Sequence, residues 1–422
     1  MEFDLAWLLL GVPLVFALGW WASRMDWRQL TLESRQAPRA YFKGLNYLLN
    51  EQQDQAIDAF IEAVQKDPDT SELHFALGGL FRRRGEFDRA IRVHEHLLAR
   101  ADLSRAERER AQHALALDFF KAGIYDRAEA AYARLEHTAH ARQAALGRLL
   151  IAERCHHWPQ AIALSRQMLE RAPEPVAPAP EADPPPEDAA AIAPLPPAAL
   201  RAHLAHYLCE QAAAIAADAT DADRLALLDD AIACAPEAAR PRIERARLLA
   251  ARGQHASALA ALAALPAHAP QALPLVAVEM VELAARCHEL PAVQTLLAQS
   301  SEAAPSLDLT EAQAQAARLL AAETAQPAEN AARQARQIYA RHLARSPSLN
   351  AAARWLEHLP ASDESDDNPR PTIGPAMQRA ARALACYRCA ACGFTAKTHF
   401  WQCPGCQSWD SMPPRRVEEI DP

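Results

Sequence analysis

Residues 83–103 read RRGEFDRAIRVHEHLLARADL, and residues 49–69, which lie 34 positions earlier, read LNEQQDQAIDAFIEAVQKDPD. At this shift Ala56 aligns with Ala90. At the same shift Ile57 aligns with Ile91, and Tyr47, just before the first stretch, aligns with Phe81. The chain therefore contains an internal repeat with a period of 34 residues.

Small residues recur where two helices of one repeat would approach each other closely. Gly44 aligns with Gly78 at the same period, as Ala56 does with Ala90. This period with small residues at fixed positions is the signature of tetratricopeptide repeats, each of which is a pair of helices. Pro68 is expected to end the second helix of the first repeat, because proline cannot continue a helix.

Further copies extend the array along the chain. Clear ones are AGIYDRAEAAYARL (122–135), HHWPQAIALSRQML (156–169) and ARGQHASALAALAAL (251–265). Weaker copies are predicted at 199–236, 270–300 and 310–346. We therefore predict an all-α chain in which a tetratricopeptide-repeat superhelix of roughly six to eight repeats forms the body.

The N-terminal segment predicts a membrane anchor. Leu5–Ala22, LAWLLLGVPLVFALGWWA, has 18 residues without a charge, and as a helix it would span about 27 Å, close to a bilayer core. Acidic residues precede it and basic residues follow it, which predicts an external N-terminus and a cytoplasmic body. A cleaved signal peptide is the alternative, but it would require a positive segment before the apolar run.

The remaining segments divide the chain. Residues 173–198 are rich in proline and residues 361–371 are acidic, so both are interpreted as breaks between folded parts. The predicted organisation is a transmembrane anchor at 1–23, a juxtamembrane linker at 24–38, repeats at 39–172, a Pro/Ala-rich insertion at 173–198, further repeats at 199–360, a linker at 361–383 and a metal-binding domain at 384–415.

Five of the nine cysteines lie close to the C-terminus, and four of them form two C-x-x-C pairs, Cys389 with Cys392 and Cys403 with Cys406. Two such turns can place four thiolates around one tetrahedral metal ion, either zinc or iron. Cys386 is also spaced to pair with Cys389. Gly393 favours the pair Cys389 and Cys392, because this position of the turn often requires a positive φ.

The other features favour a protein without catalytic activity. Cys155, Cys209, Cys234 and Cys287 are interpreted as small buried apolar residues. The common nucleotide-binding, metalloprotease and hydrolase motifs are absent from the sequence. His94, His96, His137 and His140 are expected to be surface histidines of the repeats, and the basic stretch 81–89 is either a solvated rim or a docking patch for an acidic partner. A net charge of −9 gives no reason to expect nucleic acid as a partner.

The chain resembles the lipopolysaccharide assembly protein B (LapB) family. The resemblance is closest at 41–60, 77–98, 122–129 and 387–409, and the last of these, YRCAACGFTAKTHFWQCPGCQSW, matches the family's rubredoxin-like metal motif. It implies a small C-terminal rubredoxin-like metal knuckle domain with Cys389, Cys392, Cys403 and Cys406 as ligands. The insertion at 173–198 departs from the family pattern.

The resemblance further implies a function. Such proteins lie in the cell inner membrane with repeats and metal domain in the cytoplasm. They promote proteolysis of the LpxC deacetylase by the membrane protease FtsH, and they coordinate other lipopolysaccharide assembly proteins. The alternatives are a rubredoxin-like electron-transfer protein and a generic membrane-bound chaperone adaptor, for which the clamp positions of the first repeat, Tyr41 and Leu45, carry no basic or asparagine residue.

Overall fold

The fold was analysed in a computed structural model. It describes residues 52–66, 70–171, 195–215, 221–359, 370–382, 384 and 386–420, together with Phe16, Ala17, Trp20, Lys43, Gly44, Asn46, Tyr47 and Asn50. The chain divides into two compact units, Met1–Pro194 and Leu195–Pro422, which we call unit 1 and unit 2. Each unit is described by itself.

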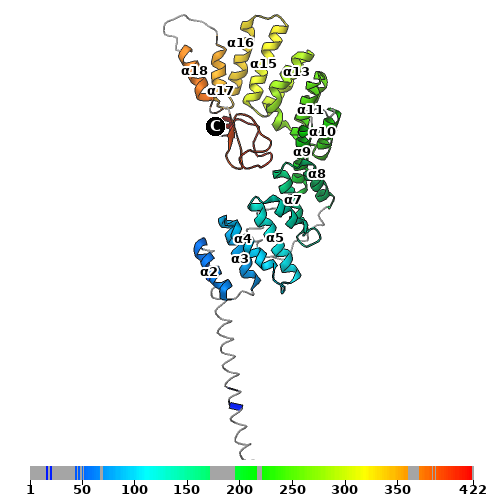
Figure 1. Ribbon diagram of the computed structural model, residues 1–422. Coiled ribbons are helices and arrows are strands. Elements are labelled where there is room, and N and C mark those ends of the chain that lie inside the picture. Colours follow the sequence, from blue (N-terminus) through cyan, green and yellow to red (C-terminus); the bar gives the residue numbers. More distant parts are fainter. Residues whose placement is uncertain are drawn as a thin grey trace, which may run out of the picture. The chain divides into compact units, whose positions relative to one another are not determined.

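Unit 1 is a stack of antiparallel helix pairs (Figure 1). Its helices are α2 (Gln53–Lys66), α3 (Ser71–Arg84), α4 (Phe87–Leu98), α5 (Arg105–Lys121), α6 (Tyr125–Ala133), α7 (Ala141–Arg154) and α8 (Trp158–Glu170). Consecutive helices contact each other, and α3 also contacts α5, as α5 contacts α7. This arrangement of a first helix packed on the first helix of the next pair is that of tetratricopeptide-like repeats, so the repeat prediction is confirmed.

The small residues of the repeat lie where they were predicted. A Cβ atom on Gly78 would lie 2.4 Å from the ring of His94 on the paired helix, and one on Gly44 would lie 2.8 Å from the ring of Phe60. Gly85, in the turn between α3 and α4, has a φ of 82°, a conformation that glycine adopts without steric cost. Pro68 lies outside the described residues, and α2 ends at Lys66.

Unit 2 continues the same architecture. Its helices are α9 (Pro197–Ala214), α10 (Asp221–Cys234), α11 (Ala239–Ala251), α12 (His255–Ala263), α13 (Ala277–Cys287), α14 (Leu290–Ala303), α15 (Leu307–Glu323), α16 (Ala328–Leu343), α17 (Leu349–Glu357), α18 (Arg370–Ala381) and α19 (Val417–Ile420). Two 3₁₀ segments, η2 (Leu265–Ala267) and η3 (Pro270–Val276), connect α12 to α13. The three weaker repeats predicted from the sequence correspond to the pairs α9/α10, α13/α14 and α15/α16.

Two helices extend into segments that the sequence predicts to be irregular. Helix α9 begins at Pro197, inside the predicted insertion, where proline is well suited to the first helical position. Helix α18 occupies Arg370–Ala381 inside the predicted linker, and it packs against α17. The acidic part of that linker, 361–369, lies outside the described residues, as does most of the Pro/Ala-rich insertion.

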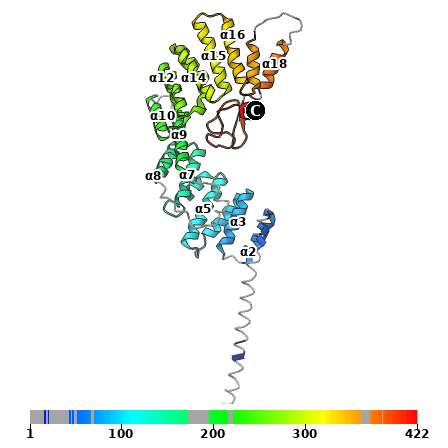
Figure 2. The same ribbon diagram turned by 180° about the vertical axis from the view of Figure 1, so that it is seen from behind.

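Residues 386–420 form a small module that we call the metal module. It contains two short antiparallel strands, β1 (Tyr387–Arg388) and β2 (Thr395–Ala396), with Tyr387 opposite Ala396, and it ends in α19. Figures 1 and 2 show this module on the inner side of the arc that α9–α17 form within unit 2. The fold class is therefore helical with one small ribbon at the C-terminus.

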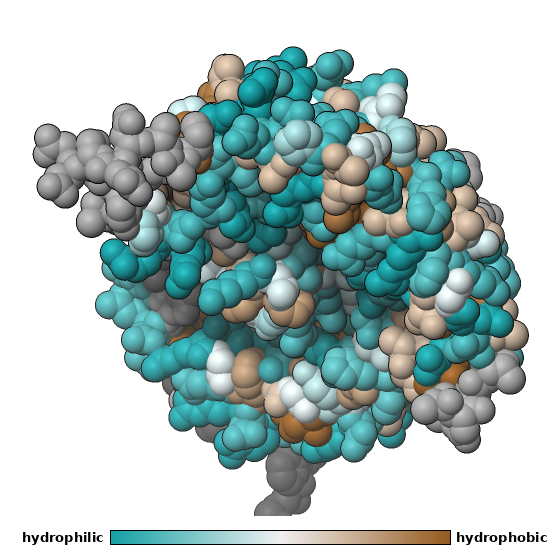
Figure 3. All heavy atoms as spheres, turned by 90° about the horizontal axis from the view of Figure 1, so that it is seen from above, coloured by the Kyte–Doolittle hydropathy of each residue, from teal (hydrophilic) through white to brown (hydrophobic). Residues whose placement is uncertain are grey.

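The surface in Figure 3 is mostly hydrophilic. Among the coloured residues of this face, the hydrophobic ones are scattered singly or in small groups. Scattered apolar residues are ordinary on a protein surface, whereas a large continuous patch would indicate an interaction site. Contacts to other molecules on this face would therefore be made chiefly through polar and charged side chains.

The predicted inner-membrane location is contradicted. Across the described ranges, no helix combines the length and the apolar character that crossing a bilayer requires. A span needs about 20 mainly apolar residues, whereas the longest described helix, α9, has 18 residues and includes Arg201 and Glu210. The segment predicted as an anchor, Leu5–Ala22, lies outside the described residues except for Phe16, Ala17 and Trp20, and the juxtamembrane linker lies outside them entirely.

Candidate metal centre

The two C-x-x-C turns have the same backbone hydrogen bonds. In the first turn, Gly393 N donates to Cys389 O at 3.0 Å and Cys389 N donates to Phe394 O at 2.8 Å. In the second, Gln407 N donates to Cys403 O at 2.8 Å and Cys403 N donates to Ser408 O at 3.0 Å. The residue after each second cysteine has a positive φ, 77° at Gly393 and 61° at Gln407. The two turns are thus equivalent knuckles, and the prediction of a positive φ at Gly393 is confirmed.

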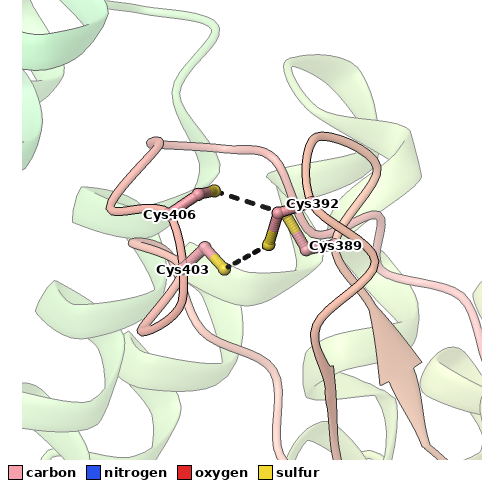
Figure 4. A group of neighbouring side chains, drawn as sticks. All are labelled: Cys389, Cys392, Cys403 and Cys406. Atoms are coloured by element: carbon pink, nitrogen blue, oxygen red, sulfur yellow. Dashed lines mark hydrogen bonds between the residues drawn. The ribbon is translucent and has the colours of Figure 1, made fainter. Parts of the chain in front are cut away.

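The four cysteines of the knuckles converge (Figure 4). Their Sγ atoms all lie within 4.8 Å of one another, with 3.8 Å between Cys389 and Cys406 and 3.7 Å between Cys392 and Cys403. A metal ion about 2.3 Å from four sulfur atoms at tetrahedral corners would place neighbouring sulfur atoms about 3.8 Å apart. The donor set therefore fits one metal ion of the zinc or iron type. Cys386 does not belong to this group of sulfur atoms.

Hydroxyl groups beside two of the cysteines favour their thiolate forms. Ser411 Oγ lies 3.3 Å from Cys389 Sγ, and this contact lowers the pKa of Cys389 to about 6. Ser408 Oγ lies 3.4 Å from Cys406 Sγ and likewise lowers the pKa of Cys406. Thiolates are the form in which cysteine binds metals, so this setting suits a metal centre.

The pKa of Cys392 shifts in the opposite direction, to about 12. The backbone of Phe394 acts to lower it, but burial and the neighbouring thiols Cys406, Cys403 and Cys389 outweigh that effect. Groups this close together cannot all ionise readily without a cation, because each negative charge disfavours the next. Four closely packed thiols thus have a strong electrostatic reason to share one positive ion.

Aromatic residues of the metal module contact the helices of unit 2 more than the metal centre. Trp409, which is 9% exposed, stacks on His206 of α9 with ring centroids 4.6 Å apart, and the guanidinium of Arg240 on α11 lies 5.8 Å from its ring. Trp401 packs against the core of unit 2. These two tryptophans therefore pack against the helices of unit 2 and are not part of the module's own buried core.

The core of the metal module is small and is completed by the helical stack. It consists of Tyr387, Cys389, Cys403 and Met412, with Leu275 of η3 packed against it. Phe394 and Phe400 remain 38% and 39% exposed. A module with so little apolar volume needs both a metal ion and a supporting surface to order it.

A hydrogen bond joins the metal module to α9, and an ion pair joins it to α15. Asp410, next to the second knuckle, accepts a hydrogen bond from His206 Nε2 at 2.8 Å. Arg416 binds Asp308 of α15 with two hydrogen bonds, at 2.9 and 3.1 Å. Burial acts to lower the pKa of Arg416, but the hydrogen bond and charge of Asp308 outweigh it and raise that pKa. Such a bidentate pair fixes orientation as well as adding attraction.

The last helix, α19, presents two carboxylates to the N-terminal ends of α15 and α17. Glu419 accepts a hydrogen bond from the Leu307 N–H at 2.5 Å, at the start of α15. Glu418 accepts hydrogen bonds from the Ser348 hydroxyl at 2.9 Å and from the Asn350 N–H at 3.3 Å, at the start of α17. The first amides of a helix lack partners within the helix and favour negative charge, so α19 caps two helices of the stack.

Two other sequence interpretations can be compared with the structure. His94 is not a surface histidine: it is 1% exposed, and its Nδ1 lies 2.5 Å from Asp118 Oδ2. Arg82, assigned to the basic rim, donates to the other oxygen of the same Asp118 at 2.6 Å. Its neighbours Arg84 and Arg89 form exposed ion pairs with Glu86 of the same stretch.

The scattered cysteines also differ from expectation. Only Cys209 is buried, whereas Cys155, Cys234 and Cys287 are partly exposed. Burial raises the pKa of Cys209 far above its usual range. The thiol of Cys209 is therefore held neutral, as a small apolar residue would be.

The functional residues that sequence reasoning missed are those that seat the metal module. His206, Asp308 and Arg240 are ordinary polar residues of repeat helices, and their partners lie far away in sequence. The acidic pair Glu418 and Glu419 directly before the C-terminus is the single local signal, because adjacent carboxylates can cap helix ends.

Comparison with known proteins places these features in a family. Residues 387–414 match the family described as "Rubredoxin metal binding domain". The chain is 31% identical to lipopolysaccharide assembly protein B of Escherichia coli (strain K12), over 97% of this chain and 98% of the relative. It is 23% identical to the protein of the same name from Haemophilus influenzae, over 98% of each chain.

Among solved structures, a tetratricopeptide repeat protein from Parabacteroides merdae matches 67% of this chain and 99% of its own, with 14% identity and a TM-score of 0.34. The sequence relationship over nearly the full length agrees with the helix pairs and the cysteine ribbon described above. By that relationship, the chain belongs to the lipopolysaccharide assembly protein B family.

Proposed function

We propose that this protein is a non-catalytic adaptor in lipopolysaccharide assembly. The observation that carries the proposal is the similarity to lipopolysaccharide assembly protein B over 97% of the chain, which includes both the helical stack and the metal module. Stacked helix pairs present extended surfaces to other proteins. The name of the relatives describes assembly and not a reaction, which also supports an adaptor.

The finer proposal concerns the partners. The adaptor promotes proteolysis of the LpxC deacetylase by the protease FtsH, and it coordinates other proteins of lipopolysaccharide assembly. An adaptor of this kind needs no reacting group of its own, because it acts by raising the local concentration of a substrate near its protease. Support comes from the family resemblance and from the helical surfaces of unit 1 and unit 2.

The experiment is a pulse-chase measurement of LpxC in cells depleted of this protein. Depletion should lengthen the half-life of LpxC several-fold, and the full chain should restore it. Restoration by Cys386→Ser but not by Cys406→Ser would link turnover to the metal module. An unchanged LpxC half-life on depletion would refute the finer proposal, whereas altered lipopolysaccharide content with unchanged LpxC would retain the broader one.

We also propose that Cys389, Cys392, Cys403 and Cys406 bind one metal ion per chain. The convergence of the four sulfur atoms within 4.8 Å supports this ligand set. All four positions around the ion are then held by protein, which suits a structural role, since a catalytic ion keeps one position for a substrate or water. Elemental analysis of the purified chain decides between zinc and iron.

Iron with a reversible visible spectrum would instead favour the electron-transfer function. Zinc would exclude it, because zinc has no redox chemistry. A ratio well below one metal ion per chain, in protein purified without chelators, would argue against the ligand set.

A further inference from the structure

The loop Ser408–Ser411, with the sequence SWDS, extends from the second knuckle, and we call it the serine loop. Its first and last residues place their hydroxyl oxygens 3.4 and 3.3 Å from sulfur atoms of the candidate metal centre. Its two middle residues contact His206 of α9: the Trp409 ring stacks on the imidazole with centroids 4.6 Å apart, and Asp410 accepts a hydrogen bond from Nε2 at 2.8 Å. Four consecutive residues thus touch both the metal centre and the helical stack.

Ser408 offers two donors to the sulfur atom of Cys406. Its backbone N–H makes a hydrogen bond to that sulfur, and its hydroxyl oxygen lies 3.4 Å from it. In the first knuckle the equivalent residue is Phe394, whose backbone N–H faces the sulfur of Cys392 but whose side chain has no donor. The hydroxyl is therefore an addition to the second knuckle that the shared backbone geometry does not require.

Ser411 connects the two knuckles. Its hydroxyl oxygen lies 3.3 Å from Cys389 Sγ in the first knuckle, and its backbone oxygen accepts a hydrogen bond from Ala390 N at 2.7 Å. The same hydroxyl donates to the backbone oxygen of Ser408 at 3.0 Å. A metal-bound thiolate has no hydrogen and would repel an oxygen lone pair, so with a metal ion present the hydroxyl hydrogen turns towards Cys389 Sγ.

The charge of an occupied site gives such donors a purpose. A divalent ion held by four thiolates leaves two negative charges in excess. Cys389 is 2% exposed, so water cannot solvate its sulfur freely. Hydrogen bonds to charged acceptors are stronger than those between neutral groups. Hydroxyl donors from the protein would therefore stabilise the occupied site more than the empty one.

We propose that the serine loop couples metal binding to docking on α9. The hydroxyl groups of Ser408 and Ser411 donate to metal-bound thiolates, while Asp410 and Trp409 hold His206. Metal binding fixes the loop in the form that meets His206, and docking in turn holds the hydroxyl groups at the sulfur atoms, because coupling between two sites is reciprocal. The inference rests on the four-cysteine metal site proposed above.

The release of Zn²⁺ from the full chain to a chromophoric chelator tests the donor role. The double variant Ser408→Ala/Ser411→Ala should release Zn²⁺ faster by about tenfold or more, since partners of metal ligands commonly contribute that much. Ser411→Thr keeps a hydroxyl and should release Zn²⁺ like the wild type. Thr398→Ala removes an exposed hydroxyl of the same module and is the matched control.

A Co²⁺-loaded chain separates hydrogen bonding from a merely structural role. Thiolates that lose a hydrogen bond give up charge to the metal more easily. The sulfur-to-cobalt absorption band should therefore move to lower energy in the double serine variant. It should stay in place in Asp410→Ala, which removes the contact to α9 and leaves both hydroxyl groups.

The coupling itself is tested by Asp410→Ala. This variant should release Zn²⁺ faster by about fivefold or more, although Asp410 is not a ligand. Added to the double serine variant, it should have less effect than it has alone, because the hydroxyl groups through which docking acts are gone. Wild-type release by Asp410→Ala, or an undiminished effect in the triple variant, would overturn the coupling.

Unchanged release and an unchanged cobalt band in the double serine variant would overturn the donor role. Both results differ from a failure of the metal site itself, in which the wild-type chain would take up neither Zn²⁺ nor Co²⁺.

Discussion

Unit 1 and unit 2 use the same helix pairs but complete them differently. In unit 1, charged side chains connect one repeat with the next: Arg82 reaches Asp118, which lies 36 residues further along the chain. In unit 2, Asp308 pairs with Arg416, 108 residues away, and His206 pairs with Asp410, 204 residues away. The first unit stabilises itself through neighbouring repeats, whereas the second relies in part on the metal module.

This difference has a consequence for stability. A stack that contacts only its neighbours can be treated as a sum of repeats and interfaces. Unit 2 cannot, because the metal module contacts α9, α11, α15 and α17 at once. We therefore expect unit 2 to unfold as one cooperative body that includes the metal module, and unit 1 to depend on local contacts.

Loss of the metal ion should have the largest effect. Replacing Cys389 or Cys406 by serine should abolish metal retention, because so small a module folds on its metal. The thermal transition of unit 2 should then fall while that of unit 1 stays in place. Elemental analysis and calorimetry of the two variants measure this, with Cys386→Ser as the matched control. Equal metal loss from Cys386→Ser would show that the proposed ligand set is wrong.

Removing one arginine from each unit sharpens the comparison. Arg82→Ala leaves the fully buried Asp118 without its guanidinium and should cost unit 1 about 3 to 5 kcal/mol. Arg416→Ala leaves Asp308 without its guanidinium partner. Because this pair is less buried, the free energy of unfolding of unit 2 should fall by about 2 kcal/mol. Denaturant titrations that follow the unfolding of each unit separately measure both changes in the free energy of unfolding. Arg105→Ala, on a side chain that is 85% exposed, is the control and should change little.

Adding a methyl group where two helices of unit 1 touch should have a smaller effect on stability. Gly78→Ala would place a methyl group 2.4 Å from the His94 ring, which Asp118 holds in position. The variant should be less stable by about 1 to 3 kcal/mol. Gly44→Ala meets the Phe60 ring at 2.8 Å and should cost less, since moving a phenyl ring does not break a buried hydrogen bond to a carboxylate as moving the His94 ring does. A larger cost at Gly44 than at Gly78 would contradict this account of the buried network.

Acid should weaken both units modestly, and the histidine with a large lowering of its pKa is His113 in unit 1 and His203 in unit 2. Burial lowers the pKa of His113 in unit 1 and of His203 in unit 2 to about 4. Because the folded pKa lies below the unfolded value of 6.5, each neutral ring contributes stability above pH 6.5 that is lost as pH falls towards 4. Between pH 6.5 and 5 each unit should lose about 1 to 2 kcal/mol.

Unfolding free energies measured across that pH range, on the wild type and on His113→Leu, decide the point. The substitution should flatten the pH dependence of unit 1 and leave that of unit 2 unchanged. A steeper slope in the variant would mean that other groups dominate.

The repeat architecture could be predicted because its signals are local. Gly78 and Ala90 recur at a fixed period, since each lies where two helices of one repeat touch. The knuckles were likewise visible, because Cys389, Cys392 and Gly393 belong to a single turn. What local pattern cannot reveal is which surfaces meet across the fold.

The errors follow from that limit. His94 has the composition of a surface position, yet its partner Asp118 lies on the next repeat, 24 residues away. Trp409 of the metal module likewise stacks on His206 of α9, which is far away in the sequence. Neither partner is specified by spacing, so pairs of this kind emerge only from the folded chain.

The central claim is that the metal module is an integral part of unit 2. Hydrogen–deuterium exchange of the full chain, before and after metal removal by a chelator, tests it most directly. We predict that amides at the starts of α15 and α17, and those of α9 beside Trp409, lose protection by at least tenfold, while α3–α8 of unit 1 keep theirs. Unchanged protection in α9, α15 and α17, or an equal loss throughout unit 1, would contradict the account.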